Sequence, residues 1–247
     1  MRPGNKRPAW SASNSPYQLN PLNLNPLRTI LEETVNFDSV RGCHQTKLFI
    51  AATQVSTGDL RVFHQDELTA DMVLASACLP LVFQAVEIDG EAYWDGGYAG
   101  NPALLPLISE TESDDLLLIQ INPNRRDTVP TRARTILDRA NEITFNASLL
   151  KELRTIALIK EVLEDAGRPD CAYKRPLFRR IDNLRLHKLD PEEALAPFAA
   201  STKSQTNLTF LEQLRNIGRQ AAENWLAKHG KHLGKKSTYP LPSKARE

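Results

Sequence analysis

The stretch Tyr93-Trp94-Asp95-Gly96-Gly97-Tyr98-Ala99-Gly100-Asn101-Pro102 places one carboxylate directly before two glycines. The residues before it, Glu91 to Trp94, have the aromatic content of a β-strand. Glycine adopts backbone conformations that a Cβ atom forbids, so a tight turn can follow Asp95 at once. That turn would hold the carboxylate at a strand end, where α/β folds commonly carry their chemistry. Asp-Gly is also the commonest hairpin turn signal, so the tripeptide alone leaves a structural and a catalytic role open.

The composition of the 247-residue chain is typical of a globular protein, with 41% hydrophobic and 25% charged residues. A net charge of +1 gives no indication of nucleic-acid binding. The longest nearly apolar run, Met72 to Phe83, is too short to cross a bilayer, and no signal peptide is visible after Met1. We therefore expect a cytoplasmic protein that has no nucleic acid as a partner.

The sequence contains no pattern that predicts a metal or a cofactor. Its three cysteines, Cys43, Cys78 and Cys171, are scattered and form no C-x-x-C spacing, which argues against a disulfide framework or a zinc site. The five histidines are dispersed, and neither a G-x-G-x-x-G nor a P-loop motif is present. We expect no cofactor.

The chain is expected to divide into three parts. Residues 1–28 are rich in proline, asparagine and serine and predict an extended arm. Residues 29–230 predict an α/β domain that is mainly helical from about residue 131. Residues 231–247 predict a basic flexible tail, with binding to an anionic membrane or a partner as the alternative interpretation.

Hydrophobic periodicity predicts the elements of the central part. The predicted strands are 47–55, 60–64, 86–88, 91–94, 116–121 and 177–189, and the predicted short helices are 27–35, 70–77 and 102–108. Two long amphipathic helices are expected, Leu208 to His229 and one whose apolar face carries Ile136, Ala140, Ile143, Ala147, Leu150, Leu153 and Ala157. Glu142 and Glu152 are expected on the opposite, solvent-facing side. Core packing explains these stripes.

Four segments around Asp95 form a longer pattern: Ala75 to Phe83, Val86 to Gly90, Tyr93 to Gly97, and Asn101-Pro102. In this order they resemble the second half of the patatin-like phospholipase family. There a small-residue helix runs into a proline, a hairpin follows, and an Asp-Gly-Gly turn leads to an Asn-Pro step. The resemblance covers most of residues 20–230, is strongest at 47–123, and includes a helical tail similar to that of bacterial members. It implies an α/β fold, a three-layer α/β/α sandwich that is incomplete in this chain.

The resemblance implies a lipid acyl hydrolase of lipid degradation that uses a serine–aspartate dyad. The serine attacks a lipid ester carbonyl and the aspartate takes its proton, which a carboxylate can do without a histidine. Asp95 carries over as the general base, and Gly96 and Gly97 shape its turn. Asn101 and Pro102 carry over as structural positions only.

The serine half of the dyad is absent from the sequence. No glycine has a serine two positions on and a glycine two further, so the chain has no G-x-S-x-G nucleophile elbow, and it has no glycine-rich oxyanion loop. In the family both elements precede the matched region, so we expect a chain that begins after the active-site half and is inactive alone. Ser76 is interpreted as a packing residue, and Ser11, Ser13 and Ser15 lack the turn chemistry, so none is nominated.

Without that half, strands 48–55 and 116–121 would expose apolar edges, which predicts an incomplete gene product or a partner chain that completes the sheet. Two function classes stay open. One is a lipid acyl hydrolase by descent, with a lipid or small ester as substrate. The other is a non-catalytic lipid- or protein-binding module, for which a peripheral membrane surface is one partner. A third interpretation is an unrelated α/β protein in which Asp95-Gly96 is merely a turn.

Overall fold

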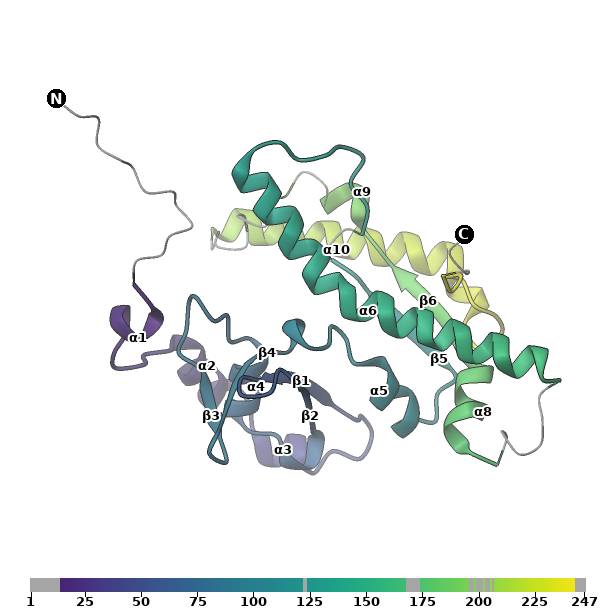
Figure 1. Cartoon of the computed structure of the whole chain (residues 1–247), viewed down its shortest axis with the longest axis horizontal. Coiled ribbons are helices and arrows are strands. Elements are labelled where there is room, and N and C mark those ends of the chain that lie inside the picture. The colour runs from purple at the N-terminus through teal and green to yellow at the C-terminus, as the bar shows by residue number, and fades with distance from the viewer. Residues whose placement is uncertain are drawn as a thin grey trace. The chain divides into compact units, whose positions relative to one another are not determined.

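The computed structural model describes residues 14–121, 124–167, 174–195, 198, 202, 205 and 207–242. The chain divides into two compact units, Met1–Pro102 and Ala103–Glu247, so the boundary falls inside the predicted 29–230 domain. Both units contain helices and a β-sheet, as the labelled elements of Figure 1 show. The α/β fold class predicted from the sequence is confirmed.

The sheet of the first unit has four antiparallel strands in the order β2-β1-β4-β3. The strands are β1 (Phe49–Gln54), β2 (Leu60–His64), β3 (Val86–Ile88) and β4 (Glu91–Asp95), close to the predicted ranges. β2 pairs with the whole length of β1 from Phe49 to Thr53, and β4 pairs with Ala52–Gln54 on its other side. The exposed apolar edge predicted for residues 48–55 is therefore wrong over Ala52–Gln54, because β4 covers it.

The hairpin between β3 and β4 follows its turn chemistry. Asp89 and Gly90 both have positive φ, 54° and 81°, which is the backbone that the two-residue turn of a twisted hairpin requires. The register pairs Val86 with Tyr93 and Ile88 with Glu91. This turn fixes which face of β4 meets the core, and Tyr93 is the buried residue of that strand.

The helices of this unit are short: α1 (Pro16–Leu19), α2 (Pro26–Thr34), α3 (Phe37–Arg41), η1 (Gln65–Glu67), α4 (Ala70–Ser76) and η2 (Gly96–Tyr98). The core combines strand residues with α4: Ala52, Phe63, Leu68, Met72, Ala75 and Tyr93. α2 begins with Pro26 after Asn25, whose side chain accepts a hydrogen bond from the Leu27 N–H. The extended arm predicted for residues 1–28 is thus helical at 16–19, where Pro16 supplies the first position of a helix, and residues 1–13 lie outside the described residues.

The second unit holds two parallel strands, β5 (Asp115–Ile119) and β6 (Arg185–Leu189). Its helices are α5 (Leu104–Glu110), α6 (Ala133–Asp165), α8 (Pro176–Asn183), α9 (Glu192–Leu195), α10 (Leu208–His229) and η4 (Gly230–His232). The strand predicted over 177–189 is wrong in its first half. Pro176 opens a helix there instead, and Ile181 of that helix is completely buried against the core.

The long helix α6 presents a different face to the core than the periodicity predicted. Ile136 and Ile143 are exposed, whereas Glu142 and Asn146 are buried and begin a stripe that continues with Leu149, Leu153, Ile156 and Leu163. The predicted buried face of α6 is rotated by about one residue from the observed one, because two polar residues occupy buried positions on the helix. Both buried polar residues have side-chain partners, so their burial carries no unpaired group.

Glu152 of α6 was also predicted to face solvent, and the structure places it at the start of α5 instead. Its Oε2 atom accepts hydrogen bonds from the N–H groups of Leu104 (2.7 Å) and Leu105 (3.0 Å). A carboxylate there satisfies N–H groups that have no partner within their own helix. Burial nevertheless raises the pKa of Glu152, because its effect exceeds that of the two backbone hydrogen bonds.

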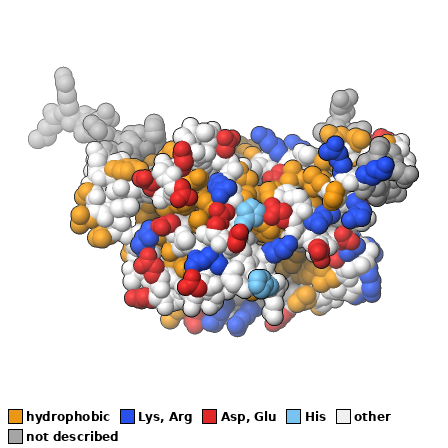
Figure 2. Space-filling view, turned by 90° about the horizontal axis from the view of Figure 1, so that it is seen from below, with side chains coloured by type: hydrophobic (Ala, Val, Ile, Leu, Met, Phe, Trp, Pro, Cys, Tyr) orange, Lys and Arg blue, Asp and Glu red, His pale blue; other side chains and the backbone are white. Residues whose placement is uncertain are grey.

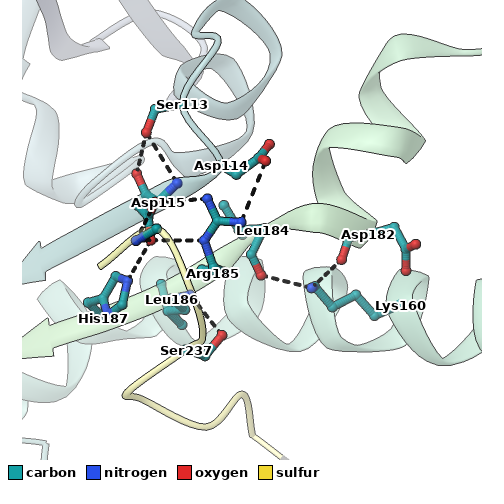
Figure 3. A network of polar contacts seen from close by, with 11 residues as sticks. Ser113, Asp114, Asp115, Lys160, Asp182, Leu184, Arg185, Leu186, His187 and Ser237 are labelled. Atoms are coloured by element: carbon teal, nitrogen blue, oxygen red, sulfur yellow. Dashed lines mark hydrogen bonds and ion pairs between the residues drawn. The ribbon is translucent and has the colours of Figure 1, made fainter. Parts of the chain in front are cut away.

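A single carboxylate joins β5, β6 and the C-terminal segment (Figure 3). Asp115 accepts from Nε (3.0 Å) and Nη2 (2.9 Å) of Arg185, its direct register partner on β6. It also accepts from the Gly234 N–H and bonds to His187 Nε2 at 2.9 Å. Charge-assisted and bidentate contacts of this kind are the strong ones in proteins, so Asp115 fixes the start of the sheet.

His187 carries this network on to the C-terminal segment. Its side chain is fully buried, and because the Asp115 carboxylate only accepts, the imidazole carries a proton on Nε2. Nδ1 forms a hydrogen bond with the Thr238 hydroxyl, 2.8 Å away. Since the Thr238 and Tyr239 N–H groups both donate to the Leu186 carbonyl, the predicted flexible tail lies bound along β6 up to residue 239. Residues 243–247 of that tail lie outside the described residues.

We expect Asp115→Asn to lower the free energy of unfolding by about 2–4 kcal/mol, because it removes the negative charge to which the Arg185 and His187 side chains bond. Asp114→Asn is the matched control, since Asp114 lies 3.6 Å from Arg185 and is more exposed. That variant should stay within about 1 kcal/mol of the wild type. Urea denaturation measures both, and equal effects in the two variants would contradict the role of Asp115.

The same site predicts a dependence on pH. The Arg185 hydrogen bonds, helped by those from His187 and Gly234, hold the pKa of Asp115 well below its usual range. The unfolded chain therefore takes up this proton at a higher pH than the folded chain, and the stability contributed by Asp115 is lost as the pH falls below about 4. Urea midpoints measured between pH 6 and pH 2 should fall more steeply for the wild type than for Asp115→Asn. Parallel curves would show that Asp115 does not contribute.

Candidate functional site

Asp95 is the last residue of β4, and Gly96–Tyr98 forms a 3₁₀ turn directly after it. β4 runs beside β1, where Asp95 is the register partner of Ala52. The strand and the immediate turn predicted from the sequence are therefore confirmed. The role of Asp95 as a base stays a prediction.

Three hydrogen bonds hold Asp95 in place. Its N–H donates to the Cys78 carbonyl at 2.9 Å, and its carbonyl accepts from the Thr53 hydroxyl at 2.8 Å. Its Oδ1 accepts from the Gly97 N–H at 2.8 Å, as the side chain of a helix cap does. The Thr53 hydroxyl also accepts from the Ala99 N–H, so this residue of β1 bonds to the chain both before and after the two glycines. Asp95 is thus held by β1, by Cys78 just after α4 and by its own turn, and the turn orients its half-buried carboxylate.

Gly96 is required for a reason other than the one that the sequence suggested. Neither Gly96 nor Gly97 has a positive φ. Instead, a Cβ atom on Gly96 would lie 2.3 Å from the Ala51 carbonyl oxygen of β1. Glycine is needed here because the turn lies directly against the backbone of β1, not because the turn needs a special conformation.

Two ionisable groups surround the carboxylate. Burial raises the pKa of the Cys78 thiol, and the negative charge of Asp95 adds to that effect. Burial also raises the pKa of the Tyr98 hydroxyl, again with a contribution from Asp95. Both groups are therefore held in their neutral forms beside the aspartate, and neither is an activated nucleophile.

The serines weighed from the sequence are engaged elsewhere. The Ser76 hydroxyl donates to the Val73 carbonyl of its own helix at 2.9 Å, and Ser15 is the cap of α1. Ser11 and Ser13 lie outside the described residues. Among the described residues, the hydrogen bond to the Asp95 carboxylate comes from a backbone N–H and not from a serine.

The second unit holds polar residues that the sequence reasoning missed. Glu142, buried on α6, bonds to Arg126 Nη2 at 2.6 Å and to Arg139 Nη1 at 3.0 Å. Burial opposes its ionisation, but the two arginines outweigh burial and lower the pKa of Glu142. Beside it, Gln120 Nε2 donates to Asn124 and Asn146. Glu142 and Asn146 lie four positions apart on α6 and therefore share one face, but the hydrophobic pattern gave no signal that this face is buried.

The described residues of this unit line at least two cavities. One, of about 420 Å³, is lined by the Glu142–arginine group, by threonines and by Phe198. The other, of about 620 Å³, lies between the end of β6 and α10 and is lined by Trp225, Lys228 and His229. Asp95 lines neither of these cavities.

Within the described ranges, no group of three histidine, cysteine or acidic side chains is arranged to hold a metal ion. No helix among the described residues is long and apolar enough to cross a bilayer. The cytoplasmic location expected from the sequence stays a prediction.

The turn after Asp95 lies within a segment that matches a known protein family. Residues 10–108 match the family model described as Patatin-like phospholipase. This segment is patatin-like. It includes β1 to β4, Asp95 and all four sequence segments that carried the resemblance, and it ends within α5. The family prediction is confirmed for this segment. None of the curated proteins matches the chain.

The patatin-like segment relates the chain to hydrolases that act on lipids. Two of its residues, Thr53 and Cys78, hold the backbone of Asp95 and were not singled out as its partners from the sequence. Thr53 had a visible signal, because it is a hydroxyl within an otherwise apolar strand. Cys78 acts through its carbonyl, which no side-chain pattern reveals.

We expect Gly96→Ala to destabilise the protein by at least about 3 kcal/mol, since the added methyl group must displace the backbone of β1. Gly218→Ala is the matched control, because Gly218 lies within α10 and has nothing within 4 Å of an added Cβ. That substitution should stabilise the protein by about 0.5–1 kcal/mol. Thermal and urea unfolding compare the two, and a neutral Gly96→Ala variant would refute the close approach.

Proposed function

We propose that this chain carries the aspartate half of a patatin-like lipid hydrolase site, with Asp95 as the general base. The observation that carries the proposal is the fixed orientation of Asp95 within the matched segment. Oδ1 is occupied by the Gly97 N–H, which leaves Oδ2 as the oxygen that would take a proton. A general base needs this kind of fixed carboxylate within hydrogen-bond reach of the group that it deprotonates.

We further propose that the chain does not hydrolyse esters by itself. Covalent catalysis needs a nucleophile within hydrogen-bond reach of its base. The sequence has no G-x-S-x-G elbow, and Ser76 bonds within α4. The matched family indicates a lipid acyl ester as the substrate class of the complete site. A partner chain that supplies the nucleophile and oxyanion donors remains part of this proposal.

A second function, a non-catalytic lipid-binding module, has its own supporting observation. Exposed leucines, a valine and a tyrosine lie on two uncharged segments of the first unit, and Cys78 of one segment bonds to Asp95. Such an exposed apolar surface would bind lipid whether or not the chain performs catalysis.

The ester assay uses p-nitrophenyl butyrate with the wild type, Asp95→Asn and the control Asp59→Asn in the β1–β2 turn. We expect equal background hydrolysis in all three, because no activated nucleophile is present for Asp95 to serve. Asparagine keeps the oxygen that accepts from Gly97, so Asp95→Asn should remain folded by circular dichroism. A fluorophosphonate probe should label no serine in the wild type.

Hydrolysis that is lost in Asp95→Asn and kept in Asp59→Asn would overturn the proposed inactivity. It would at the same time establish Asp95 as a base within this chain. A serine labelled by the probe would identify the nucleophile that the sequence pattern does not show.

A further inference from the structure

Two uncharged segments of the first unit lie against each other. Residues 15–27 and 77–86 contain no aspartate, glutamate, lysine, arginine or histidine. The Gln84 side chain donates to the Asn20 carbonyl at 2.7 Å, and the Ala85 N–H donates to the Tyr17 hydroxyl at 3.2 Å. These contacts join α1 and the residues after it to the loop that follows α4.

The side chains that this pair of segments presents are apolar and exposed. We call them the apolar face: Tyr17, Leu19, Leu22, Leu24, Leu81 and Val82. Leu22 and Leu81 are the most exposed of the six, at 78% and 80%. Figure 2 shows hydrophobic side chains gathered at the left margin of the molecule, where Figure 1 places α1. An exposed apolar patch of this kind marks an interaction site.

The apolar face is connected to Asp95 through Cys78. The Cys78 carbonyl accepts the Asp95 N–H, and its thiol donates to the Gln84 carbonyl at 3.1 Å. Leu81 and Val82 lie in the loop that these two contacts close. One end of the apolar face is therefore fixed to the residue that holds Asp95.

We infer that the apolar face docks on an electrically neutral lipid surface and brings Asp95 to it, an inference that rests on the proposed function. Neither segment offers a charge to an ionic partner, so its affinity must come from burial of apolar side chains. Asparagines at positions 20, 23 and 25 and the Tyr17 hydroxyl stand among the leucines. Apolar side chains interleaved with uncharged polar groups suit the boundary between lipid tails and headgroups.

Sedimentation with phosphatidylcholine vesicles tests this inference. The wild type should co-sediment, and Leu22→Asp with Leu81→Asp should weaken vesicle binding at least about tenfold, since two leucines lose their burial in lipid. The control is Leu158→Asp with Leu208→Asp, which changes two exposed leucines of the second unit, at 56% and 70%. It should bind as the wild type does. Adding phosphatidylserine or 0.5 M salt should change binding less than twofold.

Three results would overturn the inference: no vesicle binding by the wild type, binding that depends on phosphatidylserine, or equal binding by both double variants. Light scattering adds a fourth, a dimer that Leu22→Asp with Leu81→Asp dissociates, because a second copy would then cover the face. The ester assay is independent of these outcomes. Vesicle binding can fail while Asp95 behaves as proposed, and Asp95-dependent hydrolysis can appear while vesicle binding stands.

Discussion

The first unit depends on the close approach between Gly96 and the Ala51 carbonyl. This contact allows β4 to run beside β1 and then turn at once, so that Asp95 is held by β1, by Cys78 and by its own turn. A larger residue at position 96 would push the turn away from β1 and separate Asp95 from Thr53. The bond between Asp95 and Thr53 therefore depends on one steric constraint, which explains why a glycine follows the carboxylate directly.

Much of this arrangement could be predicted from the sequence. The turn chemistry of Asp89-Gly90 and the apolar runs located β1 to β4, because these signals are local. The reason for Gly96 could not be predicted, since it depends on β1, 45 positions earlier in the chain. The buried face of α6 was missed for a similar reason. Glu142 is buried because Arg126 and Arg139 neutralise it, and a hydrophobic pattern treats every glutamate as solvent-facing.

In the candidate site, too, the local features could be predicted and the long-range contacts could not. Asp95 could be found because a ten-residue stretch surrounds it with recognisable turn residues, and the family match includes that stretch. Its partners Thr53 and Cys78 come from other parts of the chain and bond to the backbone groups of Asp95. The second unit shows the limit of pattern reading most clearly. Its Asp115–Arg185–His187 group joins residues 70 and 72 positions apart, and no spacing in the sequence indicates it.

The bond between Asp115 and the Gly234 N–H spans 119 residues. Closing so long a loop costs chain entropy before the contact returns any stability, which slows folding. On the ribosome, β5 is synthesised long before the segment that completes its network. For that whole interval, Leu118, which is buried in the folded chain, has no β6 beside it. The second unit is therefore expected to fold late in synthesis and to expose an aggregation-prone strand until then.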